Sequence, residues 1–357
     1  MTEPAPVQTS PILQALQGER PDRTPVWFMR QAGRILPEYR KLKEKLSFLE
    51  LIRDPAIGAE VTLMPMRRFE ELDAAILFTD LLVPLEAMGV PLDYNPGPVL
   101  GWTFEGKEDL DRFEELDVED RLAVSLETAE RVRAELPSEK ALLGFVGAPF
   151  TLAAYMCEGK GSKTWARLRG MAYRDRELFE AFLSRMTDAA LAFGLALHRH
   201  GCEAIQVFDS WAGVAEPVMF REQVGPHLNR LVDGLQEANV PVIYYVNGAL
   251  QHLDTMYETG ADCLGVDWRV TMDDLCDALP KDVAIQGNLD PTMLFGSPER
   301  IEKEVRKVLD AAKDRPHIFN LGHGLEPTTP VEGVEVALET LRTWESEQPK
   351  KKASKRS

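Results

Sequence analysis

The chain has 357 residues, of which 44% are hydrophobic and 28% are charged, and this composition excludes a wholly disordered protein. Its net charge of −17 disfavours binding to nucleic acid or to an anionic membrane surface, and its four cysteines include no CxxC pair that would indicate a disulfide framework or a zinc ribbon. We therefore expect a globular protein of the reducing cytoplasm, with neither nucleic acid nor a membrane as its partner.

Short apolar or β-branched runs recur along the chain, and longer helical patterns separate them. Such runs are typical of buried parallel strands. Because no linker or composition shift marks a boundary between domains, we predict one α/β domain over residues 1–349, a single (β/α)8 TIM barrel, followed by a basic disordered tail at 350–357. The predicted strands are 25–29, 74–78, 142–146, 204–208, 242–246, 263–267, 283–287 and 317–321. The predicted helices include 174–200, 217–238, 250–258, 272–278, 298–312 and 330–345.

Targeting and membrane segments are not expected. The first 22 residues contain early proline and glutamate and no continuous apolar run, which is unlike a signal peptide. No window reaches the ~18 apolar residues that a membrane-spanning helix needs.

Polar residues and glycines follow the predicted strands. Arg30 and Arg34 follow the first, Asp80 the second, Ser210 the fourth and His323 the eighth. In a barrel of parallel strands the carboxyl ends meet at one face, where barrel enzymes have their active sites. The pattern therefore predicts an enzyme whose site lies at this face.

Two arginines flank a tight Gln-Ala-Gly segment after the first predicted strand. A pair of guanidinium groups can hold carboxylates or phosphates through bidentate hydrogen bonds. The alternative is that Arg30 and Arg34 each pair with a structural carboxylate such as Glu38, and the spacing does not decide between these interpretations.

Asp80 follows the apolar run at 74–78, so we expect its carboxylate to project into the mouth of the barrel beside apolar walls. A carboxylate there could bind a cation, act as an acid or base, or accept hydrogen bonds from N–H groups. The alternative is that Asp80 caps the helix that follows.

Three further residues are candidates with weaker signals. Tyr155 offers a phenol donor, although a buried structural tyrosine is the commoner role. Ser210 lacks the flanking glycines of a hydrolase nucleophile, so we expect a hydrogen-bonding role at most. His323 lies between two glycines, which leave room for its ring to meet a ligand.

Other reaction classes find no support in the motifs. The segment 159–164 fails the phosphate-loop pattern, and no GxGxxG follows a strand. His200 and Cys202 have the spacing of a zinc site, but they precede a strand and so belong to the opposite face of the barrel.

Two long motifs resemble the uroporphyrinogen decarboxylase family. They are PVWFMRQAGR at 25–34 and GFVGAPFTL at 144–152. Shorter matches follow in the same order: ILFTD at 76–80, FDSWAG at 208–213, GVDW at 265–268, QGNLDP at 286–291 and NLGHG at 320–324. The resemblance covers residues 11–345.

The resemblance implies a homodimeric barrel without cofactor or metal. It implies removal of carboxyl groups from the four acetate side chains of uroporphyrinogen III, which gives coproporphyrinogen III. By resemblance, Asp80 would bind the pyrrole N–H groups and stabilise the protonated pyrrole intermediate, while Arg30, Gln31 and Arg34 would contact substrate carboxylates. Tyr155, Ser210 and His323 would make further contacts, and Arg30 and Tyr155 join Asp80 as candidate catalytic residues.

Two alternatives stay open at this point. One is a zinc-dependent corrinoid methyltransferase of the same superfamily, although those relatives carry a His-x-Cys motif where this chain has Asn247 and Gly248. The other is a barrel that binds a tetrapyrrole without catalysis.

The acidic net charge does not exclude an anionic substrate. Residues 30–45 and 153–170 together carry a net charge of +7, and the other 323 residues carry −24. Because distant charges are screened beyond about 8 Å at physiological salt, we predict a positively charged site on a negatively charged molecule.

Overall fold

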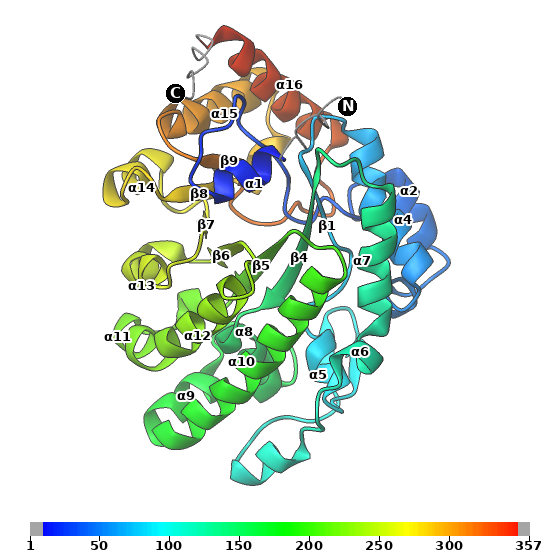
Figure 1. The fold of residues 1–357 in the computed structure, drawn as a ribbon, viewed down its shortest axis with the longest axis vertical. Helices are drawn as coiled ribbons and strands as arrows, with labels where there is room; N and C mark the ends of the chain where they lie inside the picture. The colour runs from blue at the N-terminus through cyan, green and yellow to red at the C-terminus, as the bar shows by residue number, and fades with distance from the viewer. Residues whose placement is uncertain (1–9, 349–357) are drawn as a thin grey trace, which may run out of the picture.

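In the computed structural model, which describes residues 10–348, a parallel sheet lies at the centre and helices surround it (Figure 1). The sheet has the order β1-β4-β5-β6-β7-β8-β9, and every neighbouring pair is parallel. An antiparallel hairpin, β2 with β3, stands apart from it. The strands are β1 (Ala74–Ile76), β2 (Leu92–Tyr94), β3 (Pro98–Leu100), β4 (Ala141–Gly147), β5 (Ala204–Asp209), β6 (Val242–Val246), β7 (Cys263–Val266), β8 (Ala284–Leu289) and β9 (His317–Leu321).

Seven of the eight predicted strands are confirmed to within two residues at either end. The eighth, predicted at 25–29, forms no strand and makes a single parallel bridge between Val26 and Phe319. It nevertheless lies between the two edges of the sheet. The Phe319 N–H donates to the Pro25 carbonyl (2.8 Å) on one side, and the Asp73 N–H donates to the Val26 carbonyl (2.8 Å) on the other. The structure therefore shows a curled seven-stranded parallel sheet with this segment at its gap.

Helices follow the strands and cover the outer face of the sheet (Figure 1). The helices predicted at 272–278 and 298–312 coincide with α14 and α15. The helix predicted at 174–200 begins later than expected, because the Asp175 side chain caps α10 by accepting from the Leu178 N–H (3.0 Å). The helices are α1 (Pro11–Leu16), α2 (Pro37–Lys43), α3 (Phe48–Ile52), α4 (Pro55–Arg68), α5 (Val83–Ala87), α6 (Val118–Arg121), α7 (Ala123–Glu135), α8 (Pro149–Glu158), α9 (Ala166–Arg174), α10 (Arg176–Arg199), α11 (Pro217–Met219), α12 (Gly225–Gln236), α13 (Leu253–Glu258), α14 (Met272–Ala278), α15 (Pro298–Ala312) and α16 (Val331–Glu347).

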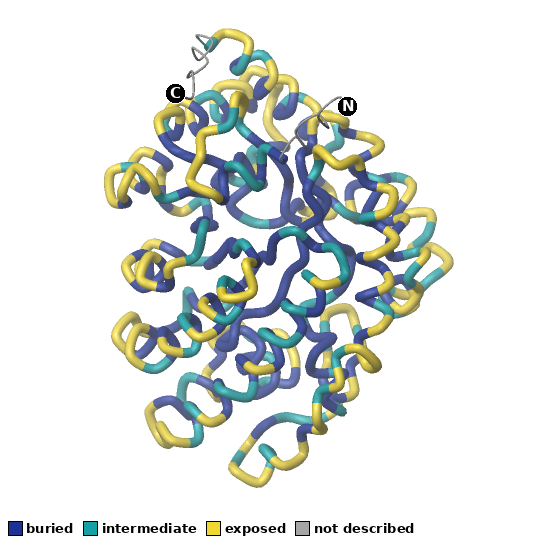
Figure 2. Tube along the Cα trace, in the orientation of Figure 1, coloured by how far each residue is buried: buried dark blue, intermediate teal, exposed yellow. Residues whose placement is uncertain are grey.

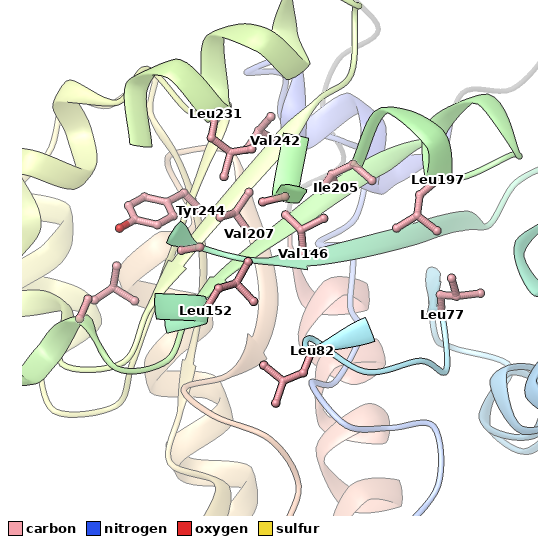
Figure 3. Packing of buried hydrophobic residues seen from close by; sticks show 14 of the residues in the cluster. Leu77, Leu82, Val146, Leu152, Leu197, Ile205, Val207, Leu231, Val242 and Tyr244 are labelled. Carbon is pink, nitrogen blue, oxygen red and sulfur yellow. The ribbon is translucent and has the colours of Figure 1, made fainter. Parts of the chain in front are cut away.

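The alternation of side chains along each strand creates two apolar clusters. In β5, Ile205 and Val207 face the helices, and in Figure 3 they pack with residues such as Leu197 of α10. Ala204 and Phe208 of the same strand face inward and join Phe145 and Tyr245 in a separate inner cluster. Figure 2 shows the resulting pattern, with a buried centre and exposed helix surfaces around it.

A buried polar chain crosses the inside of the sheet. The Trp27 indole N–H donates to Gln286 Oε1 (2.9 Å), and Gln286 Nε2 donates to Gln206 Oε1 (3.0 Å). Gln206 lies on β5 and Gln286 on β8, which are separated by two strands in the sheet order. Direct contact between their side chains therefore requires strong curvature of the sheet.

Within residues 10–348 no helix combines the length and the apolar character needed to cross a membrane. The tail predicted at 350–357 lies outside the described residues.

Candidate active site

Most of the predicted site residues follow the carboxyl ends of the central strands. Asp80 follows β1, Tyr155 lies on α8 after β4, Ser210 follows β5 and His323 follows β9. Arg30 ends the segment that lies between β9 and β1. Because these strands are parallel, segments that are far apart in sequence meet at one end of the sheet.

Asp80 lies in the loop between β1 and α5. Its Oδ1 accepts a hydrogen bond from the Leu82 N–H (2.9 Å). The N-cap residue of α5 is Leu82 itself, so Asp80 orders the loop before the helix and does not cap it. Burial raises the pKa of Asp80, and the nearby Tyr94 hydroxyl and the Leu82 N–H oppose that rise. Among residues 10–348 no group donates to its second oxygen, Oδ2, with hydrogen-bond geometry. That oxygen is available to a ligand.

Arg30 has a left-handed backbone conformation (φ 65°), which residues other than glycine rarely adopt. Its side chain lies across Gly324, where an added Cβ would be only 2.2 Å from the Arg30 Cδ. The Leu325 N–H donates to the Met29 carbonyl (2.9 Å) and joins the two loops beside this contact. The glycine after His323 is therefore required for the observed position of the Arg30 side chain.

The charges of Arg30 and Arg34 are not neutralised within the described part of the chain, because neither forms an ion pair there. Glu38, the structural partner considered from the sequence, instead pairs with Arg68 (2.9 Å). Arg30 as a whole is exposed, yet protein atoms crowd its guanidinium group. This desolvation lowers the pKa of Arg30, and the positive charge of Arg34 lowers it further. Two guanidinium groups thus remain available for an anionic ligand.

The side chain of Gln31 is buried, unlike those of the two arginines. It is only 1% exposed, and its Nε2 donates to the Ala74 carbonyl (2.8 Å) at the start of β1. Its Oε1 accepts from the Phe28 N–H (2.8 Å). With both amide atoms engaged inside the protein, Gln31 fixes the arginine loop to the sheet and is not brought to the surface with the other candidates.

Tyr155 belongs to an aromatic cluster formed by α8 and two loops. Its ring centroid lies 5.2 Å from that of Trp165 and 5.9 Å from that of Trp211. Burial raises the pKa of Tyr155 to about 12, and charge interactions with both Asp80 and Arg30 contribute to its pKa. The phenol is therefore protonated at neutral pH, and it is near enough to both of these oppositely charged groups for their charges to affect its pKa.

Ser210 is half-buried and lies in a turn held by its neighbour Asp209. The buried Asp209 carboxylate accepts hydrogen bonds from Thr151 Oγ1 (2.7 Å) and the Tyr244 hydroxyl (3.1 Å), and burial raises its pKa to about 7. Thr151 Oγ1 in turn accepts from the Trp211 N–H (3.3 Å). Within residues 10–348 the Ser210 hydroxyl makes no hydrogen bond, so it is available to a ligand.

His323 is half-buried between Tyr245 and Trp268, with ring centroids 6.4 Å and 6.2 Å away. Burial, and then the positive charges of Arg30 and Arg269, lower its pKa to about 4. The imidazole is therefore neutral at pH 7 and can offer one N–H donor and one nitrogen acceptor.

Two residues at the same end of the sheet were missed from the sequence. Arg269 follows β7, stacks over the Trp268 ring (4.2 Å) and donates to Asn247 Oδ1 (2.8 Å). Its place at a strand end was a usable signal. Tyr94 lies on the β2–β3 hairpin beside Asp80, and no pattern in the sequence indicates that contact.

The residues considered as zinc ligands have other partners. His200 contacts Glu130 (2.7 Å) and Glu119 (3.0 Å), and Cys202 is buried at the amino end of β5. Between residues 10 and 348 no three His, Cys, Asp or Glu residues are grouped closely enough to hold a metal ion.

The sequence matches a known protein family. Residues 8–344 match the family model described as uroporphyrinogen decarboxylase. The chain belongs to the uroporphyrinogen decarboxylase family. Two relatives with that name come from Geobacter metallireducens (46% identical) and Geobacter sulfurreducens (44% identical). Each match covers 90% of this chain and 94% of the relative, so the resemblance of the motifs to the uroporphyrinogen decarboxylase family is confirmed.

Solved structures with lower identity share the fold of this family member. A methyltransferase from Methanosarcina mazei matches with a TM-score of 0.81 at 21% identity, covering 94% of this chain and 98% of that chain. A putative vitamin-B12-independent methionine synthase from Listeria monocytogenes matches with a TM-score of 0.58 at 12% identity, covering 92% and 99%. At these identities the likeness concerns the fold alone.

Proposed function

We propose that this protein decarboxylates the four acetate side chains of uroporphyrinogen III to give coproporphyrinogen III and four CO2. The observation that carries the proposal is the match to curated uroporphyrinogen decarboxylases at 46% and 44% identity over 90% of the chain. No residue group within 10–348 favours the alternative zinc-dependent methyl transfer. The activity belongs to tetrapyrrole biosynthesis and makes the protein a carboxy-lyase.

Asp80 is the central residue of the proposed mechanism. Loss of CO2 from an acetate on an electron-rich pyrrole needs an electron sink, and the ring becomes that sink when it is protonated on carbon. The cation that forms needs a fixed negative charge beside it, and stabilisation of this kind is worth most in a site of low polarity. The half-buried Asp80, with its free Oδ2, is suited to this role. Because the substrate supplies its own sink, the reaction requires neither cofactor nor metal.

The other candidates bind the substrate and supply protons. Arg30 and Arg34, which lack ion-pair partners within the described residues, hold substrate carboxylates. Tyr155, Ser210 and the neutral His323 donate hydrogen bonds, and the proton that reaches the ring carbon comes from Arg30 or from water bound to the substrate. Gln31 acts through the arginine loop and does not contact the substrate, since both its amide atoms are engaged in the protein.

We further propose that residues 25–29 close the curled sheet into a (β/α)8 barrel. Support comes from the Val26–Phe319 bridge and from the hydrogen bonds that join this segment to Phe319 and Asp73. The domain predicted for residues 1–349 corresponds in this proposal to one barrel over the described residues, 10–348. By the resemblance of the motifs to the family, the protein acts in the cytoplasm as a homodimer, which sedimentation equilibrium would detect at twice the 40.0 kDa chain mass.

The function is tested by anaerobic incubation of the purified protein with uroporphyrinogen III, followed by oxidation and chromatography. Porphyrins with seven, six, five and four carboxyl groups are the expected products. Persistence of the eight-carboxyl compound alone would reject the proposal, and tight binding without products would instead identify a non-catalytic tetrapyrrole-binding protein.

A further inference from the structure

Tyr94, on β2, has a buried hydroxyl group without a hydrogen-bond partner among residues 10–348. Its ring packs edge-on against Phe48, with the centroids 4.8 Å apart. The hairpin fixes the backbone at this point, because Tyr94 is paired with Pro98 of β3. Leaving a buried polar group unsatisfied is costly, and such groups in native proteins usually have a partner in the functional state.

Asp80 is a nearby acceptor for this hydroxyl. The two groups are close enough that the Tyr94 hydroxyl lowers the pKa of Asp80 and that the Asp80 charge helps to raise the pKa of Tyr94. Asp80 Oδ1 already accepts from the Leu82 N–H, whereas Oδ2 has no donor in the described chain. A hydrogen bond from the Tyr94 hydroxyl to Oδ2 would therefore satisfy both groups.

We propose that Tyr94 is a positioning residue for the decarboxylation, and that its hydroxyl donates to Asp80 Oδ2 when substrate is bound. This inference rests on the proposed function and on the role of Asp80 in it. The hydrogen bond orients the carboxylate toward the macrocycle and stabilises its ionised form. A phenol is suited to this task because burial raises the pKa of Tyr94, which keeps the donor proton in place at all working pH values.

Burial is the main cause of the raised pKa of Asp80, and three titratable groups lie near this carboxylate. Tyr94 on β2 favours the charged form, whereas Glu86 on α5 raises the pKa of Asp80 through its negative charge. Tyr155 on α8 is also near, since the Asp80 charge raises the pKa of that phenol. Of these, the Tyr94 hydroxyl is the group that a single substitution removes without changing a charge or a candidate substrate contact.

The test is the substitution Tyr94→Phe, which removes the hydroxyl and keeps the ring against Phe48. The readout is the pH dependence of kcat with uroporphyrinogen III, because kcat reports the ionisation of groups in the enzyme–substrate complex. Because the hydroxyl favours the ionised carboxylate, its loss raises the pKa of Asp80, and the acidic limb moves upward by about one pH unit. A role limited to packing would lower kcat equally at every pH.

Tyr173→Phe on α9 is the matched control, because Tyr173 is 63% exposed and lies outside the site. Its acidic limb is expected to coincide with that of the wild type. If the wild type is active and the acidic limb of Tyr94→Phe is unchanged or moved downward relative to it, the proposal for Tyr94 is overturned. Lack of turnover by the wild type would reject the proposed function instead.

Discussion

At the scale of single residues, the site combines opposite charges that do not neutralise each other. Asp80 and the arginines Arg30 and Arg34 lie at the same end of the sheet, yet neither arginine forms an ion pair within residues 10–348. The pKa of the Tyr155 phenol is affected by the charges of both Asp80 and Arg30. A substrate with acidic side chains around an electron-rich ring fits such a division, with the arginines toward the carboxylates and Asp80 toward the ring.

Gly324→Ala tests the placement of Arg30. The new methyl group would lie 2.2 Å from the Arg30 Cδ, so the arginine side chain must leave its present position, whereas its flexibility spares the backbone. We expect kcat/KM for uroporphyrinogen III to fall by a factor of about ten or more, which corresponds to losing one charge-assisted hydrogen bond, while the melting temperature changes little.

Gly170→Ala on α9 is the control for that substitution, since a Cβ there meets nothing within 4 Å. It should keep full activity. Normal kcat/KM in Gly324→Ala would show that the position of Arg30 is not required for turnover.

The sequence identifies strand-end residues well and contacts between loops poorly. The strand-end positions of Asp80, Ser210 and His323 could be predicted because each comes two residues after a predicted strand. The burial of Gln31 could not, because its polar side chain gives no sign that the Phe28 N–H and the Ala74 carbonyl would engage it. Tyr94 was missed for the same reason, since its contact with Asp80 depends on how the hairpin folds over the end of β1.

At the scale of secondary structure elements, buried polar residues join neighbouring strands of the sheet. His317 at the start of β9 is 5% exposed, and its Nε2 lies 2.8 Å from the Gly287 carbonyl on β8, to which the neutral ring donates. Burial lowers the pKa of His317 to about 4. Its ordinary value near 6.5 returns when the protein unfolds.

His317→Gln tests this linkage, because glutamine can still donate to Gly287 but does not titrate. As the pH falls from 7 to 5, the unfolded chain binds a proton at His317 and the folded chain does not, so this group costs the wild type about 2 kcal/mol of unfolding free energy. Between pH 7 and pH 5, we expect the unfolding free energy of the variant, measured with urea, to fall by about 2 kcal/mol less than that of the wild type.

The comparison with the variant is needed because Asp209 has the opposite effect on how the unfolding free energy changes with pH. Burial raises its pKa to about 7 in the folded protein, so the folded state gains protons between pH 7 and 5 that the unfolded state does not, and stability rises. The variant carries the same Asp209, and the difference between the two proteins isolates His317. Equal pH dependence in both would contradict the assignment.

The strands could be predicted more reliably than the pairing that joins the two edges of the sheet. Runs such as 204–208 and 317–321 are confirmed because continuous burial of both faces leaves a strong apolar signal. The run at 25–29 has the same apolar signal but makes only a single bridge, because pairing depends on the geometry of both sheet edges. The β2–β3 hairpin was absent from the prediction because its short strands are only partly buried.

At the scale of the whole molecule, the distribution of charge matters more than the total. The net charge of −17 would repel a substrate with eight carboxyl groups if it acted as a whole. Screening limits each charge to about 8 Å at physiological salt, whereas an arginine about 4 Å from a carboxylate contributes about 4 kcal/mol before desolvation at an effective dielectric near 20. We therefore expect the arginines at the site to outweigh the distant acidic residues.

Ionic strength separates these contributions. If the arginines dominate, kcat/KM for uroporphyrinogen III falls when the salt concentration is raised from roughly 0.02 M to 0.2 M, because salt screens an attraction. A rise in kcat/KM over the same range would mean that the substrate experiences the net negative charge of the molecule.

The most direct test of the account is the release of CO2 by the wild type and by Asp80→Asn under anaerobic conditions. Asn keeps the shape of the side chain and removes its charge, and Asp111→Asn, at an exposed position outside the site, is the matched control. We predict four CO2 per uroporphyrinogen III from the wild type and the control, and a loss of at least about a hundredfold in rate from Asp80→Asn with an unchanged circular dichroism spectrum. A folded Asp80→Asn protein with near-normal CO2 release would contradict the proposed role of Asp80.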